Sequence, residues 1–258
     1  MIQRWFVSGA GWALALGACQ QELVVGQWAC DPDAAVTEMS GDSSMPVTMW
    51  STGFEDQFCG YIRPGGFCYT APAASHTIVT SPVHSGRFAA AFSVSAGEPD
   101  GHQTRCVRQG MLPHAAYYGA WFFIPKRLTN TGLWNLVHFQ GGEPSDQHGL
   151  WDISLVNRSN GDLELIVYDF LNRVTRRANV STPIPIGAWF HVELYLKRAA
   201  DATGEVALYQ DERLLLEAKN IVTDDTDWGQ WYVGNLASSL SASDSTLYID
   251  DVTIRSAR

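Results

Sequence analysis

From residue 47 onward the chain consists almost entirely of short β-prone runs separated by turn residues. No stretch of helical length carries the 3.6-residue period of an amphipathic helix. Asn160-Gly161, Thr203-Gly204 and Asp211-Glu212 lie between neighbouring runs, where tight hairpin turns are expected. This pattern predicts an all-β sandwich or barrel. The expected strands are 47–55, 76–80, 87–95, 103–109, 117–124, 133–140, 150–157, 162–170, 189–197, 205–210, 213–217, 230–234 and 246–255.

Alternation within these runs predicts which side chains face the core. In the run 133–140, Val137 and Phe139 are expected in the core. The opposite face should carry Trp134, Leu136, His138 and Gln140. Mixed aromatic and polar side chains suit a sugar groove, because rings stack on sugars and polar groups bind hydroxyls. The alternative is an ordinary solvent-exposed sheet face.

The first residues predict export. Arg4 precedes a short apolar run over residues 5–16, which is typical of a secretory signal and shorter than the ~20 residues of a membrane span. Leu16-Gly17-Ala18-Cys19 resembles the bacterial lipobox, which implies removal of residues 1–18 and a lipid on Cys19. Gln20 rather than Asp follows, so we expect placement in the outer membrane or at the cell surface. The alternative is a plain signal peptide with a chance cysteine.

Residues 19–46 are polar and turn-rich, and we expect a flexible tether there, followed by one domain over 47–258. Four cysteines remain after Cys19, an even number that predicts two disulfides in an oxidising compartment. Cys59 and Cys68 flank an Arg-Pro-Gly-Gly turn. Of the three possible pairings we therefore favour Cys59–Cys68 with Cys30–Cys106.

The net charge of −10 argues against nucleic acid and anionic lipid as partners. Charged residues make up only 17% of the chain and aromatic residues 12%. That composition suits a glycan binder, although any large β-sandwich shares it. We expect a monomer whose partner is a polysaccharide or other surface glycan, and whose contact with membrane is through the N-terminal lipid alone.

Three segments of the C-terminal third resemble a known family. They are IGAWFHVELYLKRAADATGEVALYQDERLLLEAKNI at 186–221, WYVGNL at 231–236 and TLYIDDVTI at 246–254. Together they resemble concanavalin-A-like jelly rolls of the polysaccharide lyase and glycan-binding type. FED at 54–56 and YYGAWFFIP at 117–125 match the opening half of that pattern. The resemblance implies a two-sheet jelly-roll sandwich, a fold that hosts lectins, hydrolases and lyases alike.

The hydrolase branch of the fold needs two carboxylates on one strand face, as in Glu-x-Asp-x-Glu. That motif does not occur in the sequence, so a retaining glycosidase is not expected. The lyase branch needs a neutraliser for the uronate carboxylate, a base and an acid. The resemblance implies His138 as base, Tyr168 as base or acid, and Gln140 with Arg105 as neutralisers.

Gln103 shares its expected face with Arg105 and would contact substrate. The family's Arg-Ser-Glu-Leu and Tyr-x-Lys-x-Gly-x-Tyr motifs do not occur. If the protein is an enzyme, we expect a metal-independent lyase that cleaves a uronate-containing glycan by β-elimination. His138 and Tyr168 have an alternative reading as structural residues of the sheet.

A second functional class also fits the sequence: a non-catalytic, lectin-like surface lipoprotein in which Trp134, Trp151 and Trp121 stack on sugars. A third functional class that fits the sequence is a structural adhesion or envelope protein. In related sandwiches a calcium ion links the first strand to the last. The resemblance implies a similar ion here, with oxygen ligands from Glu55, Asp56, Asp250 and Asp251. That ion would be structural, and no cofactor for catalysis is expected.

Overall fold

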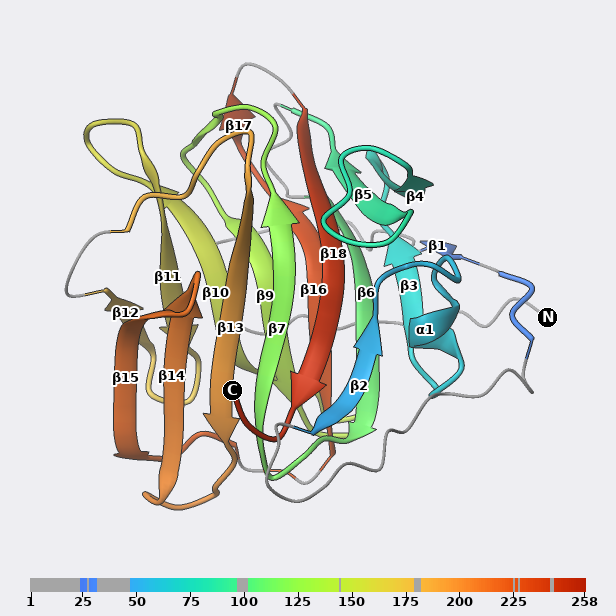
Figure 1. Cartoon of the computed structure of the whole chain (residues 1–258). Coiled ribbons are helices and arrows are strands. Elements are labelled where there is room, and N and C mark those ends of the chain that lie inside the picture. Colours follow the sequence, from blue (N-terminus) through green and yellow to red (C-terminus); the bar gives the residue numbers. More distant parts are fainter. Residues whose placement is uncertain are drawn as a thin grey trace.

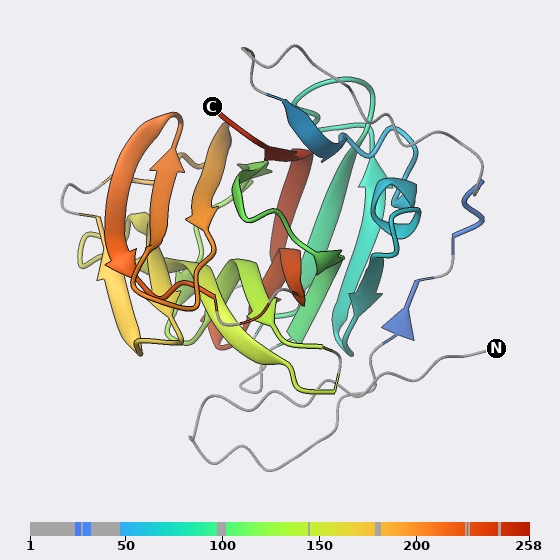
Figure 2. The same ribbon diagram turned by 90° about the horizontal axis from the view of Figure 1, so that it is seen from below.

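Two antiparallel eight-stranded sheets pack face to face in the computed structural model (Figures 1 and 2). The structure describes residues 24–26, 28–31, 47–96, 102–143, 145–178, 182–224, 226, 228–241 and 244–258. The arrangement is that of a jelly-roll sandwich, and it confirms the predicted all-β fold.

The first sheet has the strand order β1-β3-β6-β16-β9-β10-β11-β12. Its strands are β1 (Val24–Val25), β3 (Phe67–Thr70), β6 (His102–Met111), β9 (Trp134–Gly141), β10 (His148–Asn157), β11 (Leu163–Asp169), β12 (Val174–Arg177) and β16 (Trp228–Ala237). It lies behind the second sheet in the view of Figure 1.

The second sheet has the order β15-β14-β13-β7-β18-β5-β4, and β2 pairs with β18. Its strands are β2 (Thr48–Thr52), β4 (Ala74–Val79), β5 (Ala89–Val94), β7 (Ala115–Phe123), β13 (Trp189–Lys197), β14 (Gly204–Gln210), β15 (Arg213–Ile221) and β18 (Ser245–Arg255). Outside the two sheets lie the helix α1 (Cys59–Ile62) and the short pair β8 (Thr129–Asn130) and β17 (Leu240–Ser241).

Local sequence explains much of this connectivity. Asp211 and Glu212 form the two-residue turn between β14 and β15, and both adopt positive φ (47° and 67°). Turns of that shape match the twist of the flanking strands, which is why two-residue hairpins favour them.

The predicted runs overlap the long strands, whereas β3 and β12 were not predicted, because each has only four residues and lies between turns.

The core lies between the sheets and contains the largest aromatic side chains. The Tyr118 ring of the second sheet meets Phe139 and Trp231 of the first sheet at centroid distances of 5.0 Å and 5.1 Å. Phe139 is buried, as its place in the alternation predicted. Burying a ring of this size stabilises a fold by roughly 1.5–3 kcal/mol relative to exposing it.

The disulfides differ from the predicted pairing: Cys30 is bonded to Cys59, and Cys68 to Cys106. The sequence argument treated the segment between Cys59 and Cys68 as one turn. Instead it contains α1 and the start of β3, and β3 pairs with β6 so that Cys68 lies directly opposite Cys106. Two disulfides indicate an extracytoplasmic protein.

Part of the predicted tether is attached to the domain. Val24 and Val25 pair with β3, and the Trp28 ring packs against Phe58 at 4.8 Å. The signal sequence and Cys19 lie outside the described residues, as does much of the tether. Within the described residues, no helix has the length and apolar character needed to cross a bilayer.

Candidate functional site

A row of polar and aromatic side chains crosses the outer face of the first sheet. In the register of the strands, Tyr232 of β16 lies opposite His138 of β9, His138 opposite Asp152 of β10, and Asp152 opposite Tyr168 of β11. Residues directly opposite each other on neighbouring strands point to the same face. Since Phe139 and Trp231 point into the core, these four residues point outward.

A β-bulge at Leu136 brings a further residue into this face. On β10 the step from Ile153 to Ser154 covers one residue, but the facing step on β9 runs from Val137 to Asn135 and covers two. The extra residue reverses the alternation before it. Asn135 therefore points outward, where its amide donates to Ser154 Oγ at 3.3 Å.

The same bulge corrects the prediction for Trp134, which was expected on the outer face as a sugar-stacking residue. Trp134 points inward and is fully buried, and its indole N–H donates to Asn235 Oδ1 at 3.2 Å. Leu136 is buried as well. Neither side chain is available to a ligand on the outer face.

Asp152 joins His138 and Asn135 through one carboxylate oxygen. His138 Nδ1 lies 2.7 Å from Asp152 Oδ1, and the Asn135 amide donates to the same oxygen at 2.9 Å. An ionised carboxylate only accepts hydrogen bonds, so Nδ1 carries the ring proton and Nε2 is the basic nitrogen. The His138 side chain is 16% exposed and the Asp152 side chain 11%.

Arg105 places a buried positive charge beside this pair. Its Nη2 donates to Asn135 Oδ1 at 2.7 Å, and its guanidinium carbon lies 5.7 Å from the centre of the Tyr232 ring. Arg105 is only 5% exposed, and no carboxylate in the described part of the chain forms an ion pair with it. A buried charge without a counter-ion is costly, so this position favours an incoming anion.

Two further polar pairs complete the face. The Tyr232 hydroxyl lies 2.7 Å from Gln140 Oε1 and also contacts Gln230 Oε1, and the Tyr69 hydroxyl donates to Gln103 Oε1 at 2.9 Å. Burial raises the pKa of both tyrosines above the usual range, although Arg105 opposes the shift. These hydroxyls therefore stay protonated and act as hydrogen-bond donors.

Tyr168 is the more accessible tyrosine of the row. It is half-buried, and its ring packs edge-on against Phe170 at 4.7 Å. Phe170 also approaches the His138 ring at 5.9 Å. The structure thus brings together His138, Gln140, Arg105, Gln103 and Tyr168 of the predicted site on one face.

Two predicted tryptophans lie elsewhere. Trp151 is fully buried in the core, and its indole N–H donates to the Thr223 carbonyl at 2.7 Å, so it is not available to a sugar. Trp121 belongs to β7 and lies on the outer face of the second sheet, stacked against His84 at 3.8 Å and His191 at 5.1 Å. It does not share a face with His138.

The predicted calcium ligands hold a loop. Glu55 Oε1 accepts the Arg87 and Phe88 amides at 2.8 Å and 3.0 Å. Asp250 Oδ2 accepts the amides of His84 and Ser85. Among the described residues, no three acidic, histidine or cysteine side chains converge as metal ligands would. Hydrogen-bond donors at these oxygens do not fit a cation cradle, and calcium stays a prediction.

The sequence argument missed Asn135, Asp152 and Tyr232. Asp152 carried a visible signal, because it is the only charged residue in the mainly apolar sequence 150–156. Such a residue needs a partner when the strand is buried. Asn135 had no such signal, because its orientation depends on the bulge.

Comparisons with known proteins support the fold. No protein-family model matches the chain, and no curated protein sequence matches it. Among solved structures, endo-β-1,4-glucuronan lyase from the fungus Trichoderma reesei is 20% identical with a TM-score of 0.55, covering 70% of this chain and 86% of that one. The marine PL-14 alginate lyase from Aplysia kurodai is 14% identical with a TM-score of 0.56, covering 81% and 98%.

The same fold occurs in proteins described in other terms. Cellulose induced protein, Cip1, is 15% identical with a TM-score of 0.55, covering 81% of this chain and 97% of that one. A carbohydrate esterase of bacteriophage phi24B is 10% identical with a TM-score of 0.53, covering 82% and 99%. At these identities the similarity establishes a concanavalin-A-like sandwich similar to polysaccharide lyases, and activity has to be argued from the site.

Proposed function

We propose that this protein is a polysaccharide lyase that cleaves a uronate-containing glycan by β-elimination. The observation that carries the proposal is the buried Arg105 guanidinium, which is bonded to the Asn135 amide instead of a carboxylate and lies beside the His138–Asp152 pair. A uronate carboxylate supplies the missing anion, and the imidazole supplies the base. The structural similarity to a glucuronan lyase and an alginate lyase supports this choice.

Each chemical step has a candidate residue. Arg105, held by the Asn135 side-chain oxygen, stabilises the negative charge that develops on the uronate carboxylate when the neighbouring C5–H bond breaks. His138 Nε2 takes the C5 proton, and Asp152 holds the ring in the required tautomer. The C4–C5 double bond forms as the C4–O bond breaks, and the Tyr168 hydroxyl gives its proton to the leaving oxygen.

Gln140 has a positioning role in this scheme. Its side-chain oxygen is bonded to the Tyr232 hydroxyl, so its amide N–H groups are directed by that contact. Gln103 is held in the same way by Tyr69. Held in this way, the Gln140 amide would assist Arg105 in neutralising the uronate carboxylate, and the Gln103 amide would contact substrate.

The test is a panel of polyuronates and neutral polysaccharides, with product followed by the ultraviolet absorbance of the new double bond. We expect product from at least one polyuronate and from no neutral glycan. Asn135→Asp places a carboxylate against Arg105 and should abolish product, whereas Asn160→Asp in the exposed turn after β10 should not. Melting temperatures verify that both variants fold. Retention of polyuronate without product would favour the lectin-like alternative instead.

We also propose that the protein is exported and lipid-anchored at Cys19, with residues 1–18 removed. The two disulfides support an extracytoplasmic location, and the lipobox-like sequence before Cys19 supports the anchor. Cys19→Ala should release the protein from membranes in soluble form. A variant that still sediments with membranes and incorporates labelled palmitate would contradict the anchor.

A further inference from the structure

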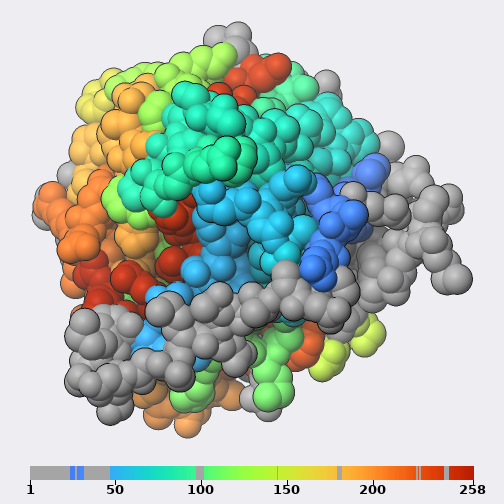
Figure 3. All heavy atoms as spheres, turned by 45° about the vertical axis from the view of Figure 1, so that its right-hand side comes forward, coloured from blue at the N-terminus to red at the C-terminus, as the bar shows by residue number. Residues whose placement is uncertain are grey.

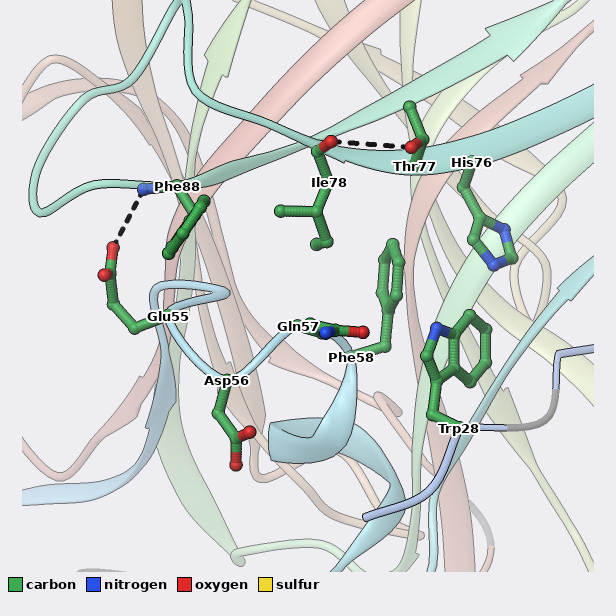
Figure 4. A pocket seen from close by; sticks show the side chains of 9 residues that line it. All are labelled: Trp28, Glu55, Asp56, Gln57, Phe58, His76, Thr77, Ile78 and Phe88. Carbon is green, nitrogen blue, oxygen red and sulfur yellow. Dashed lines mark hydrogen bonds between the residues drawn. The ribbon is translucent and has the colours of Figure 1, made fainter.

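A separate pocket lies at the edge of the sandwich, away from the row of residues on the first sheet. It is bounded by the segment that follows β2, by β4, by Phe88 and by Trp28. Its volume is about 430 Å³, within the roughly 300–1,000 Å³ typical of ligand pockets. Figure 3 shows these parts of the chain meeting on one surface: the segment with Trp28 in blue, the segment after β2 in light blue, and β4 with Phe88 in teal. Figure 4 shows the lining side chains.

Part of the pocket lining is aromatic and aliphatic. Phe58 and Phe88 lie on opposite sides of the hollow, with Ile78 between them (Figure 4). The Trp28 ring extends one wall, because it packs on Phe58 at 4.8 Å and stacks on His76 at 5.3 Å. Flat apolar walls of this kind suit the C–H faces of a pyranose ring.

His76 contributes no charge to the pocket near neutral pH. Burial lowers the pKa of His76 to about 4, and its Nδ1 lies 2.8 Å from the Thr104 hydroxyl. The imidazole therefore acts as part of the neutral wall behind Trp28.

The floor and the rim carry hydrogen-bonding groups. The Gln57 side chain lies below the hollow in Figure 4, and Gln57 has a backbone φ of 53°, a left-handed value that is unusual for glutamine. Gln57 is exposed, so its side-chain amide is open to a ligand. Glu55, Asp56 and Thr77 add further oxygen atoms at the rim.

Charge limits which ligands fit. The rim carries two carboxylates and two guanidinium groups: Arg63 pairs with Asp56, and the Arg87 guanidinium carbon lies 5.4 Å from the centre of the Phe88 ring. These charges balance, and Glu55 Oε1 also accepts the Arg87 and Phe88 amides, so the rim attracts neither a polyuronate nor an organic cation. Apolar walls with an amide and carboxylate acceptors are best matched by an uncharged, hydroxyl-rich ligand.

We propose that this pocket is a second carbohydrate-binding site, specific for uncharged saccharides and independent of the chemistry on the first sheet. A pyranose ring lies in the hollow against Phe88 and the partly exposed Trp28 ring, and its hydroxyls bind the Gln57 amide and the carboxylate oxygens of the rim. Such a site would hold the protein on a neutral glycan while the other face acts on a uronate polymer.

The experiment titrates the folded protein with cellohexaose, mannohexaose and xylohexaose to millimolar concentration, with an oligoglucuronate and choline as charged comparators. Binding is followed by two-dimensional NMR, with the Trp28 indole signal assigned from Trp28→Phe. We expect at least one neutral hexaose to shift this signal. Gln57→Ala should weaken that binding at least tenfold, and Trp28→Ala should abolish it. Trp28→Phe should retain it, because a flat ring remains.

Lyase activity gives the control that separates the two proposals. Gln57→Ala should leave product formation from polyuronate unchanged, so failure of one proposal does not affect the other. The pocket proposal is overturned if no neutral hexaose binds, if Gln57→Ala binds as tightly as the unmodified protein, or if oligoglucuronate or choline shifts the Trp28 signal instead.

Discussion

Within the described residues, two histidine–aspartate pairs of nearly the same geometry lie on opposite outer faces. On the first sheet, His138 Nδ1 lies 2.7 Å from Asp152 Oδ1. On the second sheet, His84 Nδ1 lies 2.6 Å from Asp251 Oδ2. Each histidine also touches an aromatic ring, Tyr232 at 5.2 Å for His138 and Trp121 at 3.8 Å for His84.

Their surroundings give them different chemistry. Asp152 accepts from Asn135, which in turn binds the buried Arg105 charge, so the pair lies beside an anion-attracting group. Asp251 instead accepts the Ser85 hydroxyl at 2.8 Å, so this pair ties a loop to the end of β18. A histidine–aspartate pair is therefore informative about catalysis only together with the charges around it.

The largest expected difference between the pairs is in catalysis. His138→Ala removes the proposed base and should lower the rate of elimination by ~10²–10⁴-fold. His84→Ala is the matched control and should leave the rate unchanged. The measurement is the initial rate of double-bond formation on the polyuronate that the wild type cleaves. Equal losses in both variants would remove the distinction between the two faces.

The core between the two faces gives the next largest effect, on stability. Phe139 adjoins His138 in sequence but points inward against Tyr118 and Trp231. Phe139→Ala opens a cavity and should cost about 3–5 kcal/mol of unfolding free energy, measured by urea denaturation. Phe123→Ala, at a half-buried ring on the outer face of the second sheet, should cost clearly less. The opposite order would mean that core and surface are inverted.

These comparisons also show what sequence alone could predict. Alternation placed His138 and Gln140 outside and Phe139 inside, because strand periodicity is a local property. It failed at Trp134, because the bulge at Leu136 is fixed by the register with β10 and β16, not by the residues of β9 themselves. Asn135 was missed for the same reason.

The predicted disulfide pairing was wrong for a related reason. Cys68 bonds to Cys106 because β3 and β6 are neighbours, a long-range contact that the Arg-Pro-Gly-Gly turn near Cys59 does not reveal. The fold was predictable because many short strands and turns each carry local signals that agree. To predict a strand face altered by a bulge, or a pairing between distant strands, one needs the three-dimensional register.

A smaller effect is expected where the second pair holds its loop. Asp251→Ala deprives His84 and the Ser85 hydroxyl of their acceptor. Because both side chains of the ion pair are partly exposed, water replaces some of the lost contacts, and we expect a loss of about 1 kcal/mol in unfolding free energy. Activity on polyuronate should not change. A loss of activity as large as that of His138→Ala would assign this face to catalysis.

The last expected effect is a pH dependence of stability at Asp250, next to the second pair. Burial raises the pKa of Asp250 to about 6, from an ordinary value of 3.8. Between those two values the folded protein binds more protons at Asp250 than the unfolded chain does. This carboxyl therefore makes its full contribution to stability below pH 3.8 and loses it as pH rises through about 6. Asp250→Asn cannot titrate, so it should flatten that part of the curve of unfolding free energy against pH, measured by urea denaturation at several pH values.

His138→Asn, a control on the other face, should leave the contribution of Asp250 in place. An unchanged slope in Asp250→Asn would show that another group titrates there.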